Sequence, residues 1–149
     1  MVKFRFQDLK IWQLSIEIAD ELFDIADDLE EKRLYKFAEQ LRSAGMSMSN
    51  NIAEGSGSSS KKEFKQFLNI ARRSTFENAN ILILLRKRNL IAEDLMENLL
   101  VKLDRLCRQI TNFQGSIGIQ SKTAAFCLAI FAGHFVLYAL CDNVQDIVH

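Results

Sequence analysis

Hydrophobic residues recur at three- and four-residue intervals through most of the first 114 positions of the chain. Between positions 8 and 29 they form two adjacent stripes, with acidic residues between them. The stripes are Trp12/Ile16/Ala19/Phe23/Ala26 and Ile11/Ile18/Leu22/Ile25/Leu29. This spacing predicts an amphipathic helix, and two stripes give a face wide enough to contact more than one partner helix.

The same periodicity predicts a second helix from about Arg33 to Glu54. Its later half is rich in serine, alanine and glycine, which let another backbone approach closely. The run from Gly55 to Ser59 then interrupts the pattern with two glycines and three serines. We expect this run to be a loop.

Two further helices follow. Ser60 and Glu63 fit the S-x-x-E capping box, which predicts a helix start, and Asn89 can adopt the left-handed conformation that ends a helix near position 88. Leucines at helical spacing continue from 95 to 106, and Gly115 and Gly118 are expected to end the fourth helix. Four helices with short connections predict an antiparallel up-down bundle.

Composition supports an all-α class. The 149 residues include no proline and only 6 glycines, too few for the many tight turns of a β-sandwich or barrel. Hydrophobic residues make up 48% and charged residues 26%, which excludes wholesale disorder. We expect a bundle domain over residues 1–116 and an apolar C-terminal extension of unknown role over residues 117–149.

The extension holds no charge from 123 to 141, a length that falls within the roughly 17–25 residues of a membrane-spanning helix. His134 weighs against a span, because a histidine near the bilayer centre is costly. An additional helix packed in the fold or in an oligomer is favoured. A C-terminal membrane anchor and a disordered end are the alternatives.

Three cysteines without metal-like spacing, Cys107, Cys127 and Cys141, are expected to be reduced thiols. The opening MVKFRFQDLK has no apolar run of the kind found in secretory signals. Both features lead us to expect a cytoplasmic protein.

Charge is distributed unevenly, although 19 basic and 19 acidic residues cancel. Residues 1–31 carry 3 basic and 9 acidic side chains, whereas residues 32–92 carry 12 basic and 4 acidic ones. The favoured interpretation is that the acidic first helix pairs with the basic second and third helices inside the bundle. The alternative is an exposed basic surface able to hold RNA or DNA phosphates. Its residues would be Lys61, Lys62, Lys65, Arg72, Arg73, Arg86, Lys87 and Arg88.

Polar residues form a second stripe on both central helices, and a bundle would bring the two stripes together. Buried polar groups need hydrogen-bond partners, so we expect an interhelical polar network. Its members would be Gln40, Asn51, Glu54, Ser74 and Glu77. Such a network most simply fixes helix register or a subunit contact; a functional pocket built on Glu54 and Glu77 is the alternative.

Catalytic chemistry has few candidate residues. The only histidines, His134 and His149, lie in the tail, so the four helices contain no Glu-x-x-His step for a di-metal site and no histidine base for a nucleophile. Phosphate-cradling glycine motifs are also absent from the sequence. We therefore expect no catalytic residues, no cofactor and no metal.

Residues 40–82, and Asn51 to Gly55 (NIAEG) in particular, resemble the bacterial four-helix bundle proteins first noted in intervening sequences of large-subunit ribosomal RNA genes. FQDLKIWQLS fits that family's opening pattern, and the resemblance covers residues 4–114. It implies a homopentamer without catalytic activity. Relatives include the accessory variability determinant proteins of diversity-generating retroelements, which bind a reverse transcriptase and nucleic acid.

These observations predict a non-enzymatic assembly or binding module whose partner is itself. The alternative function is nucleic-acid binding, with RNA, DNA or a nucleic-acid enzyme as partner, through the basic surface. Membrane contact through the tail is not favoured.

Overall fold

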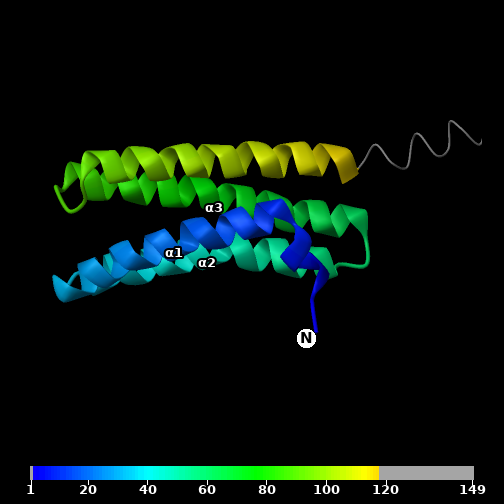
Figure 1. Cartoon of the computed structure of the whole chain (residues 1–149), viewed down its shortest axis with the longest axis horizontal. Coiled ribbons are helices and arrows are strands. Elements are labelled where there is room, and N and C mark those ends of the chain that lie inside the picture. Colours follow the sequence, from blue (N-terminus) through cyan, green and yellow to red (C-terminus); the bar gives the residue numbers. More distant parts are fainter. Residues whose placement is uncertain (1, 118–149) are drawn as a thin grey trace, which may run out of the picture. The chain divides into compact units, whose positions relative to one another are not determined.

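Four helices occupy most of residues 2–117, the part of the chain that this computed structural model describes. They are α1 (Lys10–Glu31), α2 (Tyr35–Gly57), α3 (Lys61–Lys87) and a fourth helix over residues 93–117. Neighbouring helices run in opposite directions along a common axis, as Figure 1 shows. The predicted all-α four-helix bundle is confirmed, and the predicted C-terminal helix lies outside the described residues.

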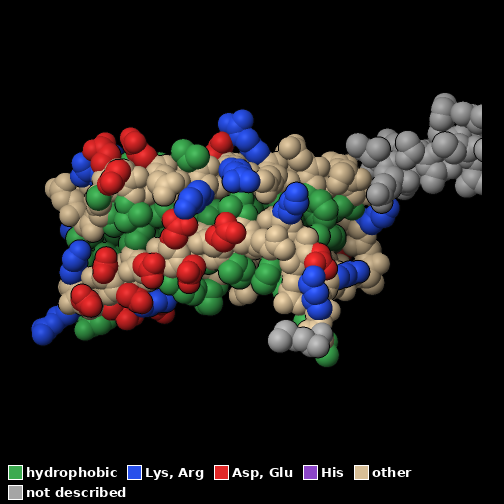
Figure 2. All heavy atoms as spheres, viewed as in Figure 1, with side chains coloured by type: hydrophobic (Ala, Val, Ile, Leu, Met, Phe, Trp, Pro, Cys, Tyr) green, Lys and Arg blue, Asp and Glu red, His purple; other side chains and the backbone are tan. Residues whose placement is uncertain are grey.

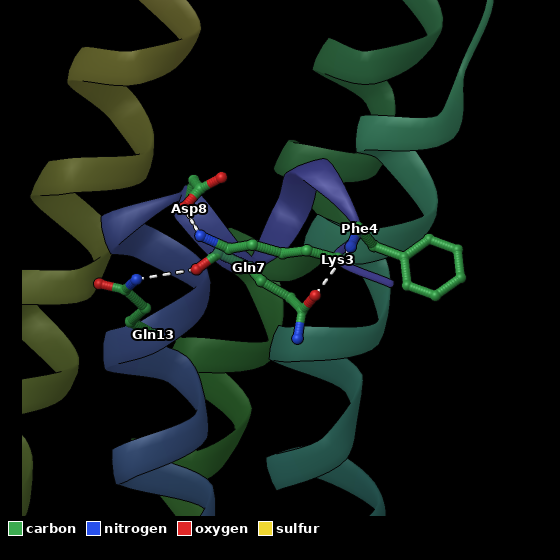
Figure 3. A network of polar contacts seen from close by, with 5 residues as sticks. All are labelled: Lys3, Phe4, Gln7, Asp8 and Gln13. Carbon is green, nitrogen blue, oxygen red and sulfur yellow. Dashed lines mark hydrogen bonds and ion pairs between the residues drawn. The ribbon is translucent and has the colours of Figure 1, made fainter. Parts of the chain in front are cut away.

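A 3-10 turn, η1 (Arg5–Asp8), leads into α1 and is fixed by polar contacts (Figure 3). The Phe4 N–H donates to Gln7 Oε1 at 2.8 Å, and the Gln13 side-chain amide donates to the Gln7 carbonyl at 2.8 Å. Lys3 and Asp8 form an ion pair beside them. These contacts hold the N-terminal segment against the start of α1.

Residues in the left-handed conformation end α1 and α3. Arg33 has a φ of 59° and Asn89 a φ of 56°. After α3, the Leu90 N–H donates to the Leu85 carbonyl at 3.0 Å, which is the long bond of a Schellman motif. The prediction that Asn89 ends the third helix is confirmed.

The expected loop from Gly55 to Ser59 is shorter than predicted, because α2 continues through Gly57. Gly55 is buried inside the helix, where an added Cβ would lie 2.6 Å from Phe67 Cβ and 2.8 Å from the Phe64 ring. This glycine therefore serves close packing of α2 on α3, and the turn occupies residues 58–60. As predicted, the Ser60 hydroxyl caps α3 by accepting from the Glu63 N–H at 3.1 Å.

The fourth helix also passes a predicted end. Gly115 was expected to terminate it, but the helix runs to residue 117. A glycine lowers helix propensity by about 1 kcal/mol without removing a backbone donor, so it weakens a helix but does not stop it. None of the helices within residues 2–117 combines the length and apolar character needed to cross a membrane.

The core is a column of aliphatic side chains contributed by all four helices. The largest fully buried ones are Ile18, Leu22, Leu29, Leu41, Met48, Ile52, Leu68, Leu82, Leu85, Leu99, Leu106 and Ile110. On α1 the stripe that begins at Ile11 is buried, and of the other stripe Ala19 and Ala26 are buried, whereas Ile16 is 41% exposed. The buried face of α1 is thus as wide as its sequence suggested, except at Ile16.

Candidate interaction surfaces

The seam between α2 and α3 contains most of the predicted polar network. Gln40 Nε2 donates to Glu77 Oε1 at 2.6 Å, and the hydroxyls of Ser47 and Ser74 lie 2.9 Å apart. Asn51 Nδ2 donates to the Ser47 carbonyl at 2.7 Å, which adds a link within α2. Two hydrogen-bonded contacts therefore join the helices, at separate levels of the seam.

The structure differs from the prediction in burial and in one member. Gln40 and Glu77 are exposed, so their contact lies at the edge of the seam. Glu54 is also exposed, and within residues 2–117 its carboxylate has no hydrogen bond or ion pair. It lies near the end of α2, where no donor of α3 reaches it. The predicted membership of Glu54 in the network is therefore wrong for this chain as a monomer.

Sequence reasoning left out Asn78, which is fully buried. Its Nδ2 donates to the Ser74 carbonyl one turn earlier at 2.8 Å, while its Oδ1 has no partner in the described part of the chain. The sequence does indicate this buried polar group, because Asn78 follows Ser74 by four residues on the apolar side of α3.

All eight predicted basic residues lie on α3 or directly after it, but they do not share one face. Arg72 bonds Asn69 at 3.1 Å, and Arg86 forms an ion pair with Glu93 at 2.9 Å. The side chains of the other six make no hydrogen bond or ion pair within the described residues. They are Lys61, Lys62, Lys65, Arg73, Lys87 and Arg88.

Lys62, Arg73 and Lys87 are spaced by 11 and 14 residues, which places them on one side of a helix with 3.6 residues per turn. All three are exposed. We call this line the cationic ridge of α3. Exposed amides lie between its residues on the same side, at Gln66, Asn69 and Asn80, and the exposed Glu77, which bonds Gln40, follows Arg73 by one turn.

The opposite charge gathers on α1 (Figure 2). Five exposed carboxylates recur at three- and four-residue spacing and form no ion pair among residues 2–117. We call them the acidic ridge of α1: Glu17, Asp20, Asp24, Asp28 and Glu31.

The carboxylates beside this ridge do have partners. Lys102 of the fourth helix lies 2.7 Å from Glu21, and Arg42 of α2 pairs with both Asp27 and Glu30. These hydrogen bonds raise the pKa of Arg42, and the bond to Glu30 has a larger effect than the bond to Asp27. The described ion pairs therefore link α1 to α2 and to the fourth helix, and none links α1 to α3.

Large apolar side chains are exposed on both flanks of the cationic ridge. Phe76 is 61% exposed, and Ile70, Ile83 and Leu84 are each 43% exposed. Phe76 also borders a cavity of about 130 Å³ that Leu100 and Cys107 of the fourth helix line. α3 thus presents apolar surface together with unpaired positive charge.

A second cavity, of about 330 Å³, lies at the turn between α2 and α3. Arg5, Lys61 and Phe64 line it together with serines of the turn. Neither Glu54 nor Glu77, the pair considered for a functional pocket, lines either of these cavities. Within residues 2–117, no cluster of three His, Cys, Asp or Glu side chains could hold a metal ion.

Comparison with known protein families gives the same family as the resemblance carried by Asn51 to Gly55 (NIAEG). The family model of the 23S rRNA-intervening sequence protein matches residues 7–112. The chain belongs to this family. The match runs from η1, just before α1, to the late part of the fourth helix, as the resemblance in the sequence implied.

A protein of solved structure has a fold similar to that of this chain. It is a protein of unknown function from the S23 ribosomal protein family of Bacteroides thetaiotaomicron, with 22% identity and a TM-score of 0.67. The alignment covers 70% of this chain and 97% of the relative. No curated protein matches the chain.

Proposed function

We propose that this protein is a homo-oligomeric helical module that acts by binding and has no catalytic activity. The observation that carries the proposal is the exposed apolar surface of α3, above all Phe76 at 61% exposure. Monomeric proteins rarely expose contiguous apolar patches larger than a few hundred Å², and aromatic residues are enriched in protein interfaces. A second copy would remove this surface from water.

The family resemblance supports five copies as the number of subunits. A cyclic assembly of three or more copies uses two different surfaces of each copy, so that both surfaces are covered once the ring closes. The bundle offers two differently charged ridges for such a contact. A homopentamer is therefore the assembly that we propose.

Size-exclusion chromatography with light scattering on the full chain tests this proposal. We expect a mass of about five times the 17.1 kDa of one chain, and a lower mass for Phe76→Glu. Tyr35→Glu is the matched control, because Tyr35 is also aromatic and 60% exposed but lies at the start of α2. A monomeric full chain at micromolar concentration would refute the proposal.

A second function, nucleic-acid binding, is favoured by the unpaired cations of α3. Lys62, Arg73 and Lys87 are exposed and free of carboxylate partners in residues 2–117. Phosphates of RNA or DNA would neutralise them with release of counterions. The same contact could recruit the protein to a nucleic-acid enzyme.

Fluorescence anisotropy with generic RNA and DNA oligonucleotides tests the second function. Affinity should fall steeply between about 50 and 200 mM salt, and it should fall further when Lys62, Arg73 and Lys87 are changed to alanine. Lys32→Ala with Lys36→Ala is the control, because these exposed lysines lie outside α3, after the end of α1 and in the first turn of α2. Absent or salt-independent binding would exclude this function.

A further inference from the structure

We propose that copies of this chain associate side by side in the same orientation, with the acidic ridge of α1 in one copy against the cationic ridge of α3 in the next. The inference rests on the proposed homo-oligomer and names the two surfaces that form its contact. Its basis is that the two ridges carry opposite charge and have no ionic partners within residues 2–117.

The acidic ridge is a line of exposed carboxylates along the outer side of α1 that are unpaired within residues 2–117. Its five carboxylates run from Glu17 to Glu31, a length of about 21 Å at 1.5 Å per residue. Positive side chains of the neighbouring helices reach only the flanks of α1, where Arg42 and Lys102 pair with other carboxylates. The ridge itself is left facing outward with uncompensated negative charge.

The two ridges lie on non-adjacent helices of the bundle. The backbone of α1 approaches α2 closely, and that of α3 also approaches α2, but α1 and α3 do not approach each other. Diagonal positions in a four-helix bundle expose their outer edges in opposite directions. One copy therefore cannot pair its own ridges, whereas a second copy in the same orientation can.

The polarity of the helices suits this arrangement. α1 and α3 run in the same direction, because α2 reverses the chain between them (Figure 1). Rotation about an axis along the bundle would place α1 of one copy beside α3 of the next without inverting either. Such a contact joins two different surfaces, and repeated rotation can close it into a ring.

Charge and apolar burial would have separate roles in the contact. Phe76 and Ile83, on the flank of the cationic ridge, supply surface that gains free energy when it leaves water. The ion pairs select the orientation and the partner and speed association. Nucleic acid would neutralise the cationic ridge alone and would leave the acidic ridge unpaired, so a second copy satisfies more of the observed surface.

Charge reversal of each ridge tests the proposal by light scattering at about 50 mM salt, where screening is weak. Asp24→Lys with Asp28→Lys, or Arg73→Glu with Lys87→Glu, should each reduce the oligomer to monomers. A chain that carries all four substitutions should assemble again. An equimolar mixture of the two double variants should also associate, although neither variant does so alone. Its products should be open chains or even-numbered rings, because a ring of five cannot alternate the two variants.

Matched reversals at other exposed sites control for net charge. Glu39→Lys with Glu97→Lys copies the first change in charge, and Lys32→Glu with Lys36→Glu copies the second. Both controls should keep the wild-type mass. Circular dichroism and urea unfolding of every variant should show that the helices are retained, because all of these positions are exposed.

The outcomes separate the two proposals. An oligomer that survives either double reversal, or one that the four-fold variant fails to restore, would overturn the ridge contact and leave the homo-oligomer standing. A wild-type monomer would overturn both. Loss of nucleic-acid binding on reversal of α3, with an unchanged mass for both double variants, would assign the cationic ridge to nucleic acid.

Discussion

α2 packs on α1 along one seam and on α3 along another, and each seam contains a glycine. Only the seam with α3 is too close for a side chain at its glycine. At the seam with α1, an added Cβ on Gly45 would lie 3.4 Å from Leu22 Cδ1, an ordinary van der Waals contact. At the seam with α3, a Cβ on Gly55 would lie 2.6 Å from Phe67 Cβ, which real structures do not tolerate. The backbones of α2 and α3 therefore approach more closely at Gly55 than side chains allow.

The polar contacts of the two seams also differ, since those of the α1–α2 seam are exposed and one of those of the α2–α3 seam is part-buried. The α1–α2 seam is bordered by ion pairs from Arg42 to exposed carboxylates, which are weak because water and salt screen them. The α2–α3 seam has the part-buried contact between Ser47 and Ser74. Shape and short hydrogen bonds specify the second seam, whereas the first tolerates changes of size.

Gly55→Ala should give the largest loss of stability. The methyl group would meet Phe67 Cβ, which cannot move without its backbone, and overpacking of this kind costs about 1–3 kcal/mol. After the gain of about 1 kcal/mol in helix propensity, we expect a net loss of about 1 kcal/mol. Urea unfolding at a fixed protein concentration measures it. An unchanged urea midpoint would contradict this prediction, because it would mean that α2 and α3 can move apart to admit the methyl group with no loss of stability.

Gly45→Ala is the matched control and should act in the opposite direction. The contact with Leu22 leaves room for a methyl group, and alanine is favoured over glycine in a helix interior by about 0.5–1 kcal/mol. We expect a gain in unfolding free energy of that size, measured under the same conditions. A loss here would show that both seams are equally tight.

Ser47→Ala should weaken the α2–α3 seam by only about 0.5 kcal/mol. It removes the contact to the Ser74 hydroxyl, but Ser74 keeps its bond to the Ile70 carbonyl at 3.2 Å. Asn51 likewise keeps its bond to the backbone carbonyl of residue 47. A double-mutant cycle with Ser74→Ala isolates the pair, and a coupling near zero would contradict its role in the seam.

Helical periodicity predicted the bundle because the spacing of buried side chains on a helix depends on the local sequence alone. Asn89 was predicted correctly for the same reason, since its left-handed conformation closes α3 through neighbouring residues. The sequence predicts a loop at Gly55, because two nearby glycines normally break a helix. The contact with Phe67, twelve residues away, decides its conformation, and a local pattern does not contain that contact.

The polar network was predictable in part. Polar stripes on α2 and α3 indicated which helix sides meet, and Gln40 and Glu77 do meet. A stripe does not indicate how deep each position lies, so the exposure of these two residues was missed. It also does not show where a partner helix lacks a donor, which is why Glu54 was included.

Glu54→Ala should have the smallest effect. The carboxylate is exposed and without partners in the described residues, and it lies three residues before the end of α2, where negative charge opposes the helix dipole. We expect a change in unfolding free energy within about 0.5 kcal/mol, with a slight gain in stability. Glu54→Gln is the control that removes the charge and keeps the size.

A loss of more than about 1 kcal/mol on Glu54→Ala would require a hydrogen-bonded partner for this carboxylate. Within one copy no such group is present among residues 2–117, so the partner would have to come from outside them. Unfolding at several protein concentrations identifies a neighbouring copy as the source, because stabilisation by association increases with concentration and stabilisation within one chain does not.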